Sequence, residues 1–217
     1  MDKVYKTVLK CGQHEIEERK SRFIATVKPV TEEDEAIEFI SGLKTRYWDA
    51  THNVYAYLVM GDSIIQRFSD DGEPSGTAGL PMMEVIKKMG IRDLVVVVTR
   101  YFGGTQLGAS GLIRAYSKSA IMGIEAAQIV TKKLCGEMSI VLEYPQLGRV
   151  QNLLISEGFP IKDIAYEQDV EIKVFVPWDK IHYFTDIVTE ATSAHSTIKR
   201  ITKTYITLDS QGRLILD

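Results

Sequence analysis

The sequence feature that most constrains the fold is the run of five aliphatic residues from Leu94 to Val98. A strand with large aliphatic side chains on both faces needs cover on both sides, as central strands of layered folds have. Residues 99–102 extend the run, and a glycine-rich loop follows over residues 103–108. Beyond the loop, apolar side chains step by three and four from about Ser110, which predicts a long helix. We therefore expect a covered central strand that leads through a glycine loop into a helix.

The residues before this strand predict two further helices and several strands. Strand signals run through residues 14–30, and a helix over residues 31–47 begins with Thr31 as its cap. Residues 54–60 and 64–68 form the two arms of an expected hairpin. A second helix is expected to begin at Pro81 and to end at Gly90.

The second half of the chain follows a regular order of elements. Strands are predicted at residues 139–144, 161–166, 170–176 and 199–208, and helices at residues 145–157 and 177–191. The order β-α-β-β-α-β is the ferredoxin-like arrangement. We therefore expect an α+β protein of two domains, residues 1–135 and residues 136–217, with the boundary near Leu134–Glu137.

Composition excludes several classes of protein. The 217 residues are 45% hydrophobic and 25% charged, which is average for a globular chain and unlike a disordered, fibrous or membrane protein. No secretory signal is visible, and Cys11 and Cys135 are too few for a disulfide framework or a cysteine-rich zinc site. A cytoplasmic protein with reduced thiols is expected. The histidines lack metal-binding spacing, so no metal or cofactor is expected; they are His14, His52, His182 and His195.

The strand, glycine loop and helix over residues 94–128 form a candidate anion site. Backbone N–H groups and the positive end of a helix converge at such a junction. No Asp or Glu lies between Asp93 and Glu125, although three basic residues do. Alternatively, the glycines only permit a tight turn and the basic residues are solvated. The candidate RNA or anion contacts are Arg100, Tyr101, Gly103, Gly104, Gly108, Ser110, Arg114 and Lys118. Among them, the last three are spaced by four and form one stripe on the helix.

Known nucleotide-binding and hydrolase motifs do not fit this loop. The spacing from Gly103 to Gly108 is that of a P-loop, but Ala109 stands where the phosphate-binding lysine is required. The dinucleotide pattern G-x-G-x-x-G and the nucleophile-elbow pattern G-x-S-x-G are absent there. We therefore assign no catalytic residue from the sequence.

The glycine-rich, acidic loop over residues 70–79 is a second candidate site. Its carboxylates suit a divalent cation or general acid and base work, whereas Asp-Gly pairs are also ordinary turn chemistry. The candidate residues are Asp70, Asp71, Glu73, Ser75 and Thr77.

Two blocks of sequence resemble the IMPACT family, in its bacterial YigZ-type branch. The first block runs from Asp71 to Pro81, and the second runs from Val97 through Gly104 and continues at residues 107–108, 111–112 and 114–116. The resemblance covers roughly residues 17–128 in its strongest part. It implies a first domain similar to an RNA-contacting domain of a small-subunit ribosomal protein and of elongation factor G (domain IV), an α/β sandwich. It also implies a ferredoxin-like second domain similar to the last domain of that factor.

The resemblance implies a role in translation. Eukaryotic relatives, which carry an additional N-terminal module, restrain a starvation-activated translation-initiation kinase, and their partner contacts are not transferred here. For the bacterial branch, nucleic-acid or ribosome binding is the usual inference. Likeness of fold alone does not establish function.

Three functions remain open on the sequence. The first is a non-enzymatic protein that binds structured RNA or the ribosome through the glycine loop and helix and modulates translation, with no membrane contact. The second is an enzyme or binding protein for a small phosphorylated or nucleotide-like ligand, in which the acidic and glycine loops meet in one cleft. The third is a protein–protein adaptor, with a translation-associated protein as a partner. Its acidic second domain, with a charge of −4 over residues 136–217, would dock a basic partner, or its sheet would pair with another chain.

Overall fold

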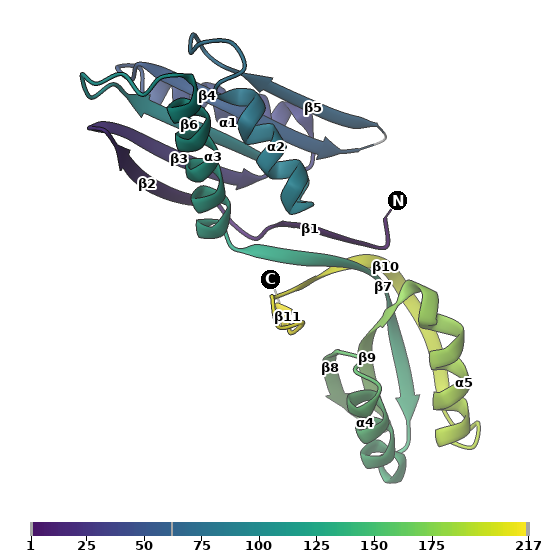
Figure 1. The fold of residues 1–217 in the computed structure, drawn as a ribbon. Coiled ribbons are helices and arrows are strands. Elements are labelled where there is room, and N and C mark those ends of the chain that lie inside the picture. Colours follow the sequence, from purple (N-terminus) through teal and green to yellow (C-terminus); the bar gives the residue numbers. More distant parts are fainter. Residues whose placement is uncertain (1, 62, 216–217) are drawn as a thin grey trace. The chain divides into compact units, whose positions relative to one another are not determined.

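The computed structural model describes residues 2–61 and 63–215 and divides into two compact units (Figure 1). The N-terminal unit spans Tyr5–Val130. The C-terminal unit begins at Thr131 and also takes in the start of the chain up to Val4. The division lies five residues before the boundary expected from the sequence. The expected α+β class and two-domain organisation are confirmed.

The N-terminal unit contains a five-stranded antiparallel sheet in the order β2-β3-β6-β4-β5. Its strands are β2 (Gly12–Glu18), β3 (Ser21–Pro29), β4 (His52–Met60), β5 (Ile64–Ser69) and β6 (Leu94–Tyr101). The aliphatic run forms β6 and lies at the centre of the sheet, as predicted. Its side chains alternate between the two faces, so both faces of the sheet need cover.

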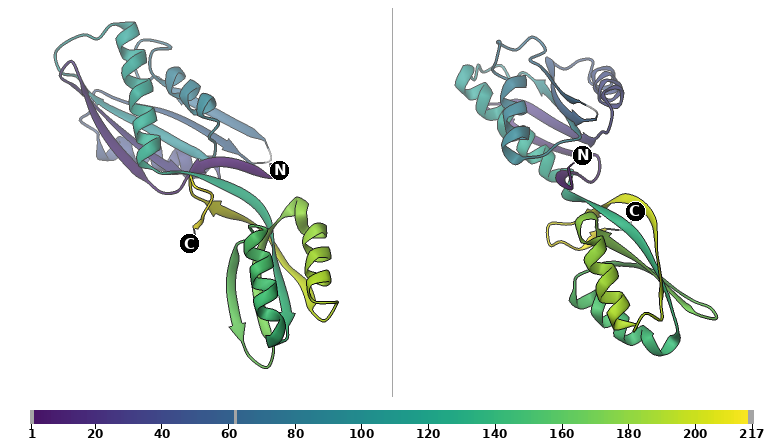
Figure 2. Two further views of the ribbon diagram at one scale, coloured as in Figure 1. Left: turned by 60° about the horizontal axis from the view of Figure 1, so that its bottom comes forward. Right: turned by 90° about the vertical axis from the view of Figure 1, so that its right-hand side faces the viewer.

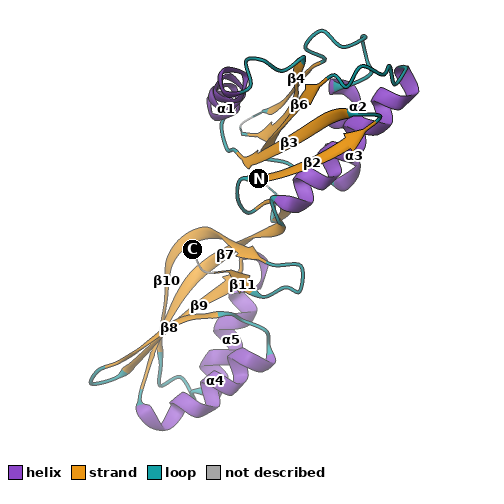
Figure 3. Cartoon of the chain, turned by 90° about the vertical axis from the view of Figure 1, so that its left-hand side faces the viewer, coloured by secondary structure: helices purple, strands orange, loops and turns teal. Residues whose placement is uncertain are grey.

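Helices cover both faces of this sheet (Figure 3). On one face α1 (Glu33–Arg46) packs against Val95 and Val97. On the other face α2 (Gly79–Met89) and α3 (Ala109–Ala126) pack against Val96 and Val98. The unbroken valine run therefore serves two hydrophobic cores, which explains why it shows no polar alternation.

Helix ends differ from the prediction by one or two residues. The cap of α1 is Glu32 rather than Thr31, whose N–H instead donates to the Glu35 carboxylate at 2.7 Å. The α2 helix begins at Gly79, before Pro81, and Gly90 closes it in the left-handed conformation with a φ of 65°. In the part of the chain that the structure describes, no helix has the length and hydropathy to cross a membrane.

The C-terminal unit has the predicted β-α-β-β-α-β order (Figure 2). Its sheet order is β11-β10-β7-β9-β8, which is the ferredoxin-like order with β11 added, and β1 (Val4–Val8) also pairs with β7. The elements are β7 (Ile129–Leu142), α4 (Leu147–Ser156), β8 (Ile161–Tyr166), β9 (Val170–Pro177), α5 (Ile181–Ala191), β10 (Thr197–Leu208) and β11 (Leu214–Ile215). Short 3₁₀ turns precede α4 and α5, where the sequence predicted continuous helix.

Candidate functional site

The basic stripe of α3 lies on the surface, as its spacing predicted. Ser110, Arg114 and Lys118 are all exposed. The two basic side chains line a groove of about 280 Å³ together with Arg19, from the turn between β2 and β3. The only acidic residue among the residues that line this groove is Glu18. We call Ser110, Arg114, Lys118 and Arg19 the α3 basic face.

Sequence reasoning missed Arg19 because it treated residues 14–30 as one stretch of strand. The chain turns back at Arg19 and Lys20, which both have positive φ angles, of 49° and 68°. Two adjacent non-glycine residues in this conformation leave little sequence signal for a turn. The Arg19 guanidinium also donates to the backbone carbonyl of Gln106 at 3.4 Å, so it touches the glycine loop.

The three candidate glycines of the loop have different structural roles. Gly103 packs against the β2–β3 turn so closely that a Cβ would lie 2.0 Å from the carbonyl carbon of Lys20. Its N–H donates to Ser21 Oγ at 3.1 Å, so this donor is already engaged. Gly104 and Gly108 have φ angles of 81° and 72°, which other residues rarely adopt. The last of these glycines immediately precedes α3.

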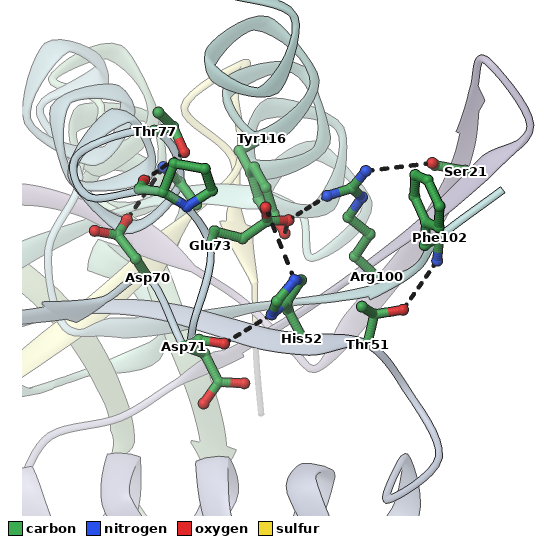
Figure 4. Close-up of polar contacts among 12 residues, drawn as sticks. Ser21, Thr51, His52, Asp70, Asp71, Glu73, Thr77, Arg100, Phe102 and Tyr116 are labelled. Carbon is green, nitrogen blue, oxygen red and sulfur yellow. Dashed lines mark hydrogen bonds and ion pairs between the residues drawn. The ribbon is translucent and has the colours of Figure 1, made fainter. Parts of the chain in front are cut away.

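Arg100 is buried rather than exposed beside the RNA contacts, which corrects the expectation. Its guanidinium forms an ion pair of 2.6 Å with Glu73, and both side chains are almost inaccessible to solvent (Figure 4). The hydroxyl of Tyr116 donates to the same carboxylate oxygen at 2.7 Å. Burial, followed by this hydrogen bond, raises the pKa of Tyr116. The cluster therefore joins the acidic loop, β6 and α3.

His52 connects the same cluster to the backbone of the acidic loop. Its Nδ1 lies 2.8 Å from the carbonyl oxygen of Asp71, a distance at which Nδ1–H donates. Its Nε2 lies 3.8 Å from Glu73 Oε2, which is too long for a hydrogen bond. The imidazole is therefore oriented by one nitrogen while the other is not engaged by a close partner.

The other two carboxylates of the acidic loop have different partners: Asp70 binds the backbone of the loop, whereas Asp71 binds residues of α1 and β4. Asp70 accepts from the N–H groups of Gly76 and Gly79, each at 2.8 Å. Asp71 pairs with Lys44 at 2.6 Å and also accepts from the Asn53 N–H at 2.6 Å. Among the described residues no three potential ligands gather into a metal site.

The remaining candidates also have defined environments. Thr77 donates to the carbonyl of Pro74 at 2.6 Å, whereas Ser75 is exposed and belongs to no contact described for this loop. Tyr101 donates to Asp49 at 2.8 Å, and this hydrogen bond raises the pKa of its hydroxyl. Phe102 is 48% exposed at the entrance to the glycine loop.

The acidic and glycine loops meet in a pocket of about 350 Å³ within the N-terminal unit. Of the three acidic candidates only Glu73 lines it, and of the three loop glycines only Gly108 does. The pocket brings Glu73 and Arg100 together, whereas Asp70, Asp71 and Gly104 do not line it. The lining residues are Thr51, His52, Glu73, Pro74, Arg100, Phe102, Gln106, Leu107, Gly108, Ala109 and Leu112.

Comparison with known proteins finds similarity over both units. Residues 19–124 match the Impact N-terminal domain, and residues 140–195 match a domain of unknown function (DUF1949). The IMPACT family member YvyE of Bacillus subtilis (strain 168) is 45% identical over 202 residues, which is 93% of each chain. The IMPACT family member YigZ of Escherichia coli (strain K12) is 32% identical over 77% of this chain and 83% of its own. A crystal structure of a hypothetical protein is 27% identical with a TM-score of 0.59, and covers 93% of this chain and 99% of that one.

Proposed function

The chain belongs to the IMPACT family, and we propose that it is a non-enzymatic protein that binds structured RNA through the α3 basic face and modulates translation. The ribosome is the proposed source of that RNA, with a translation-associated protein as a further partner. The cytoplasm is then the proposed compartment. Family membership supports the link to translation, and the surface of α3 supports the contact with RNA.

The observation that carries the proposal is the pair Arg114 and Lys118. They lie four residues apart, about one helical turn, and both are exposed. Among the described ion pairs none includes either side chain, so both charges are open to phosphate oxygens. Together with Arg19 they give three positive charges against the single carboxylate of Glu18 in the same groove. Such a surface attracts nucleic acid by neutralising phosphates and releasing counterions.

The glycine loop supports the same reading. The loop leads into the N-terminus of α3. The first turn of α3 contains no acidic residue, and its cap, Gly108, has no side chain. The start of α3 therefore adds no negative side chain that would repel phosphates bound along the α3 basic face. Arg100 has a different role from the one expected. Its buried ion pair with Glu73, which also accepts from Tyr116, connects the acidic loop to α3.

The geometry of the acidic residues favours binding over catalysis. Asp70 accepts from N–H groups of the loop backbone, and Asp71 pairs with Lys44 and accepts from the Asn53 N–H. Glu73 accepts hydrogen bonds from Arg100 and Tyr116, which both occupy the same carboxylate oxygen. None of the three carboxylates is positioned as a free general base.

Sedimentation of the purified protein with ribosomes through sucrose tests the proposal. At about 50 mM salt we expect co-sedimentation, which falls at about 200 mM salt because phosphate contacts release counterions. The double variant Arg114→Ala/Lys118→Ala should no longer co-sediment with ribosomes. The matched control Arg149→Ala/Lys180→Ala removes the same charge from exposed positions of the C-terminal unit and should still co-sediment.

Two results would contradict the proposal. One is the absence of co-sedimentation at either salt concentration with a folded protein. The other is equal co-sedimentation of the two double variants, which would remove the α3 basic face as the contact.

A further inference from the structure

We propose that the pocket beside His52 binds a small phosphate monoester that carries a ring, such as a nucleoside monophosphate. We call this cavity of about 350 Å³ the His52 pocket; its lining residues are those given above. Its volume lies within the range of small-ligand sites. It is a different surface from the groove of the α3 basic face, with which it shares only Leu107.

The start of α3 supplies the anion-binding end of the pocket. Gly108, Ala109 and Leu112 line the cavity, and α3 continues for 18 residues. The first N–H groups of a helix have no partner within it, and here no side chain caps them. The helix dipole adds a partial positive charge at this end. An oxyanion in the pocket would therefore meet donors rather than acceptors at α3.

Arg100 provides an independent indication of a ligand. The residue lines the pocket, is only 5% exposed, and its Nε–H has no hydrogen-bond partner among the described residues. Its other two nitrogens are engaged by Glu73 at 2.6 Å and Ser21 at 3.4 Å. A buried donor without an acceptor is unfavourable, and the side chain that carries it lines the pocket. Arg100 and Glu73 carry opposite charges, so the pair adds no net charge to the pocket.

His52 adds a polar group whose orientation is fixed before any ligand binds. The carbonyl of Asp71 holds Nδ1, and Nε2 has no partner within hydrogen-bonding distance. The second ionisation of a phosphate monoester has a pKa of about 6, so the monoester still carries some protons near neutral pH. A neutral Nε2 can accept such a proton, and a protonated imidazole can donate to the phosphate.

The rest of the pocket is apolar and favours a ring over a bare phosphate. Pro74, Leu107 and Leu112 line it together with Phe102, which is 48% exposed. An exposed phenylalanine at the mouth of a pocket offers a flat surface for stacking a base. The ring would lie against Phe102 while the phosphate lies at the start of α3. The ligand is either a free mononucleotide or the phosphorylated end of an RNA, since both present the same group.

Calorimetric titration of the full chain tests the assignment. The probes are inorganic phosphate, adenosine 5′-monophosphate, and a short RNA with either a 5′-phosphate or a 5′-hydroxyl. We expect saturable binding of the mononucleotide, tighter than that of inorganic phosphate. His52→Gln should weaken the binding of the mononucleotide and of inorganic phosphate about tenfold, which corresponds to about 1.4 kcal/mol in binding free energy. Phe102→Ala should weaken only the mononucleotide, and Arg114→Ala/Lys118→Ala should leave mononucleotide binding unchanged.

The RNA probes identify the source of the ligand. Competition between the mononucleotide and the 5′-phosphorylated RNA, but not the 5′-hydroxyl RNA, supports the pocket with an RNA end as its ligand. Binding of the mononucleotide without such competition supports the pocket with a free nucleotide as its ligand. Both tests are independent of ribosome co-sedimentation, so the two proposals can fail separately.

Three outcomes would overturn the proposal. The first is that no probe binds saturably at concentrations up to about 10 mM, although the protein has a native circular dichroism spectrum. Any dissociation constant would then exceed about 10 mM. The second is binding that neither His52→Gln nor Phe102→Ala changes. The third is mononucleotide binding that is lost in Arg114→Ala/Lys118→Ala, which would assign it to the α3 basic face.

Discussion

Glu73 and Arg100 form a buried ion pair on which three segments of the N-terminal unit converge. The carboxylate comes from the acidic loop, the guanidinium from β6, and the Tyr116 hydroxyl from α3. Both charged side chains are almost fully buried, so each depends on the other for compensation. The pair therefore organises the loop that borders the His52 pocket.

Removal of the Glu73 carboxylate should destabilise the fold strongly. Glu73→Ala leaves a buried guanidinium without its partner, and we expect the free energy of unfolding to fall by about 3–5 kcal/mol. Urea denaturation followed by circular dichroism measures this change. The matched control is Glu15→Ala, which removes an exposed pair with Arg22 and should lower it by about 1 kcal/mol or less. Equal losses for the two variants would contradict the structural role of the buried pair.

The two cysteines should react at very different rates. Cys11 is exposed, whereas burial raises the pKa of the Cys135 thiol to about 11. The thiolate is the reactive form, so Cys135 stays unreactive at neutral pH and gains reactivity only as the pH rises toward its pKa. Titration with a chromogenic disulfide should show one fast thiol per chain and a second after unfolding. A fast thiol that persists in Cys11→Ser would contradict this assignment.

At the scale of elements, the sequence predicted the central strand and the basic stripe of α3 because both depend on local periodicity. Leu94–Val98 and the stripe from Ser110 to Lys118 lie where that periodicity placed them. The burial of Arg100 could not be predicted in this way, since its partner lies 27 residues away in the sequence. Arg19 was missed for a related reason, because only the folded β2–β3 turn brings it beside α3.

The glycine loop should be sensitive to a single added methyl group. Gly103→Ala places a Cβ against the Lys20 backbone, so we expect a loss of about 3 kcal/mol in the free energy of unfolding. The matched control is Gly42→Ala in α1, where a Cβ meets nothing within 4 Å. That variant should stabilise the helix by about 0.5–1 kcal/mol, and opposite shifts of the melting temperature check the pair. Similar shifts for both would contradict the close approach at Gly103.

At the scale of the whole molecule, the order of elements was more predictable than their extents. The β-α-β-β-α-β pattern of the C-terminal unit follows from hydrophobic periodicity and turn residues. In contrast, β7 begins at Ile129, ten residues before the predicted strand at Ser139. The extra length includes polar residues such as Lys132, and it is a strand because β10 pairs with it. A pairing partner more than 70 residues away leaves no local signal.

Charge is distributed unequally between the two halves of the sequence. Residues 136–217 carry a net charge of −4, whereas residues 1–135 carry +1. Counted over the structural units, however, the N-terminal unit carries a net charge of −1 and the C-terminal unit −2. The RNA contact is therefore expected where basic side chains gather locally, on the α3 basic face. We expect the proposed protein partner to bind the C-terminal unit.

The salt dependence of RNA binding tests the central claim most directly. The affinity for a structured ribosomal RNA fragment is measured across a salt series for the unmodified protein, for Arg114→Ala/Lys118→Ala and for the control Arg149→Ala/Lys180→Ala. Each lost phosphate contact lowers the slope of log affinity against log salt by about 0.7–0.9. We predict a slope about 1.4–1.8 shallower for the first variant and an unchanged slope for the control. Equal slopes and affinities for all three proteins would contradict RNA binding through α3.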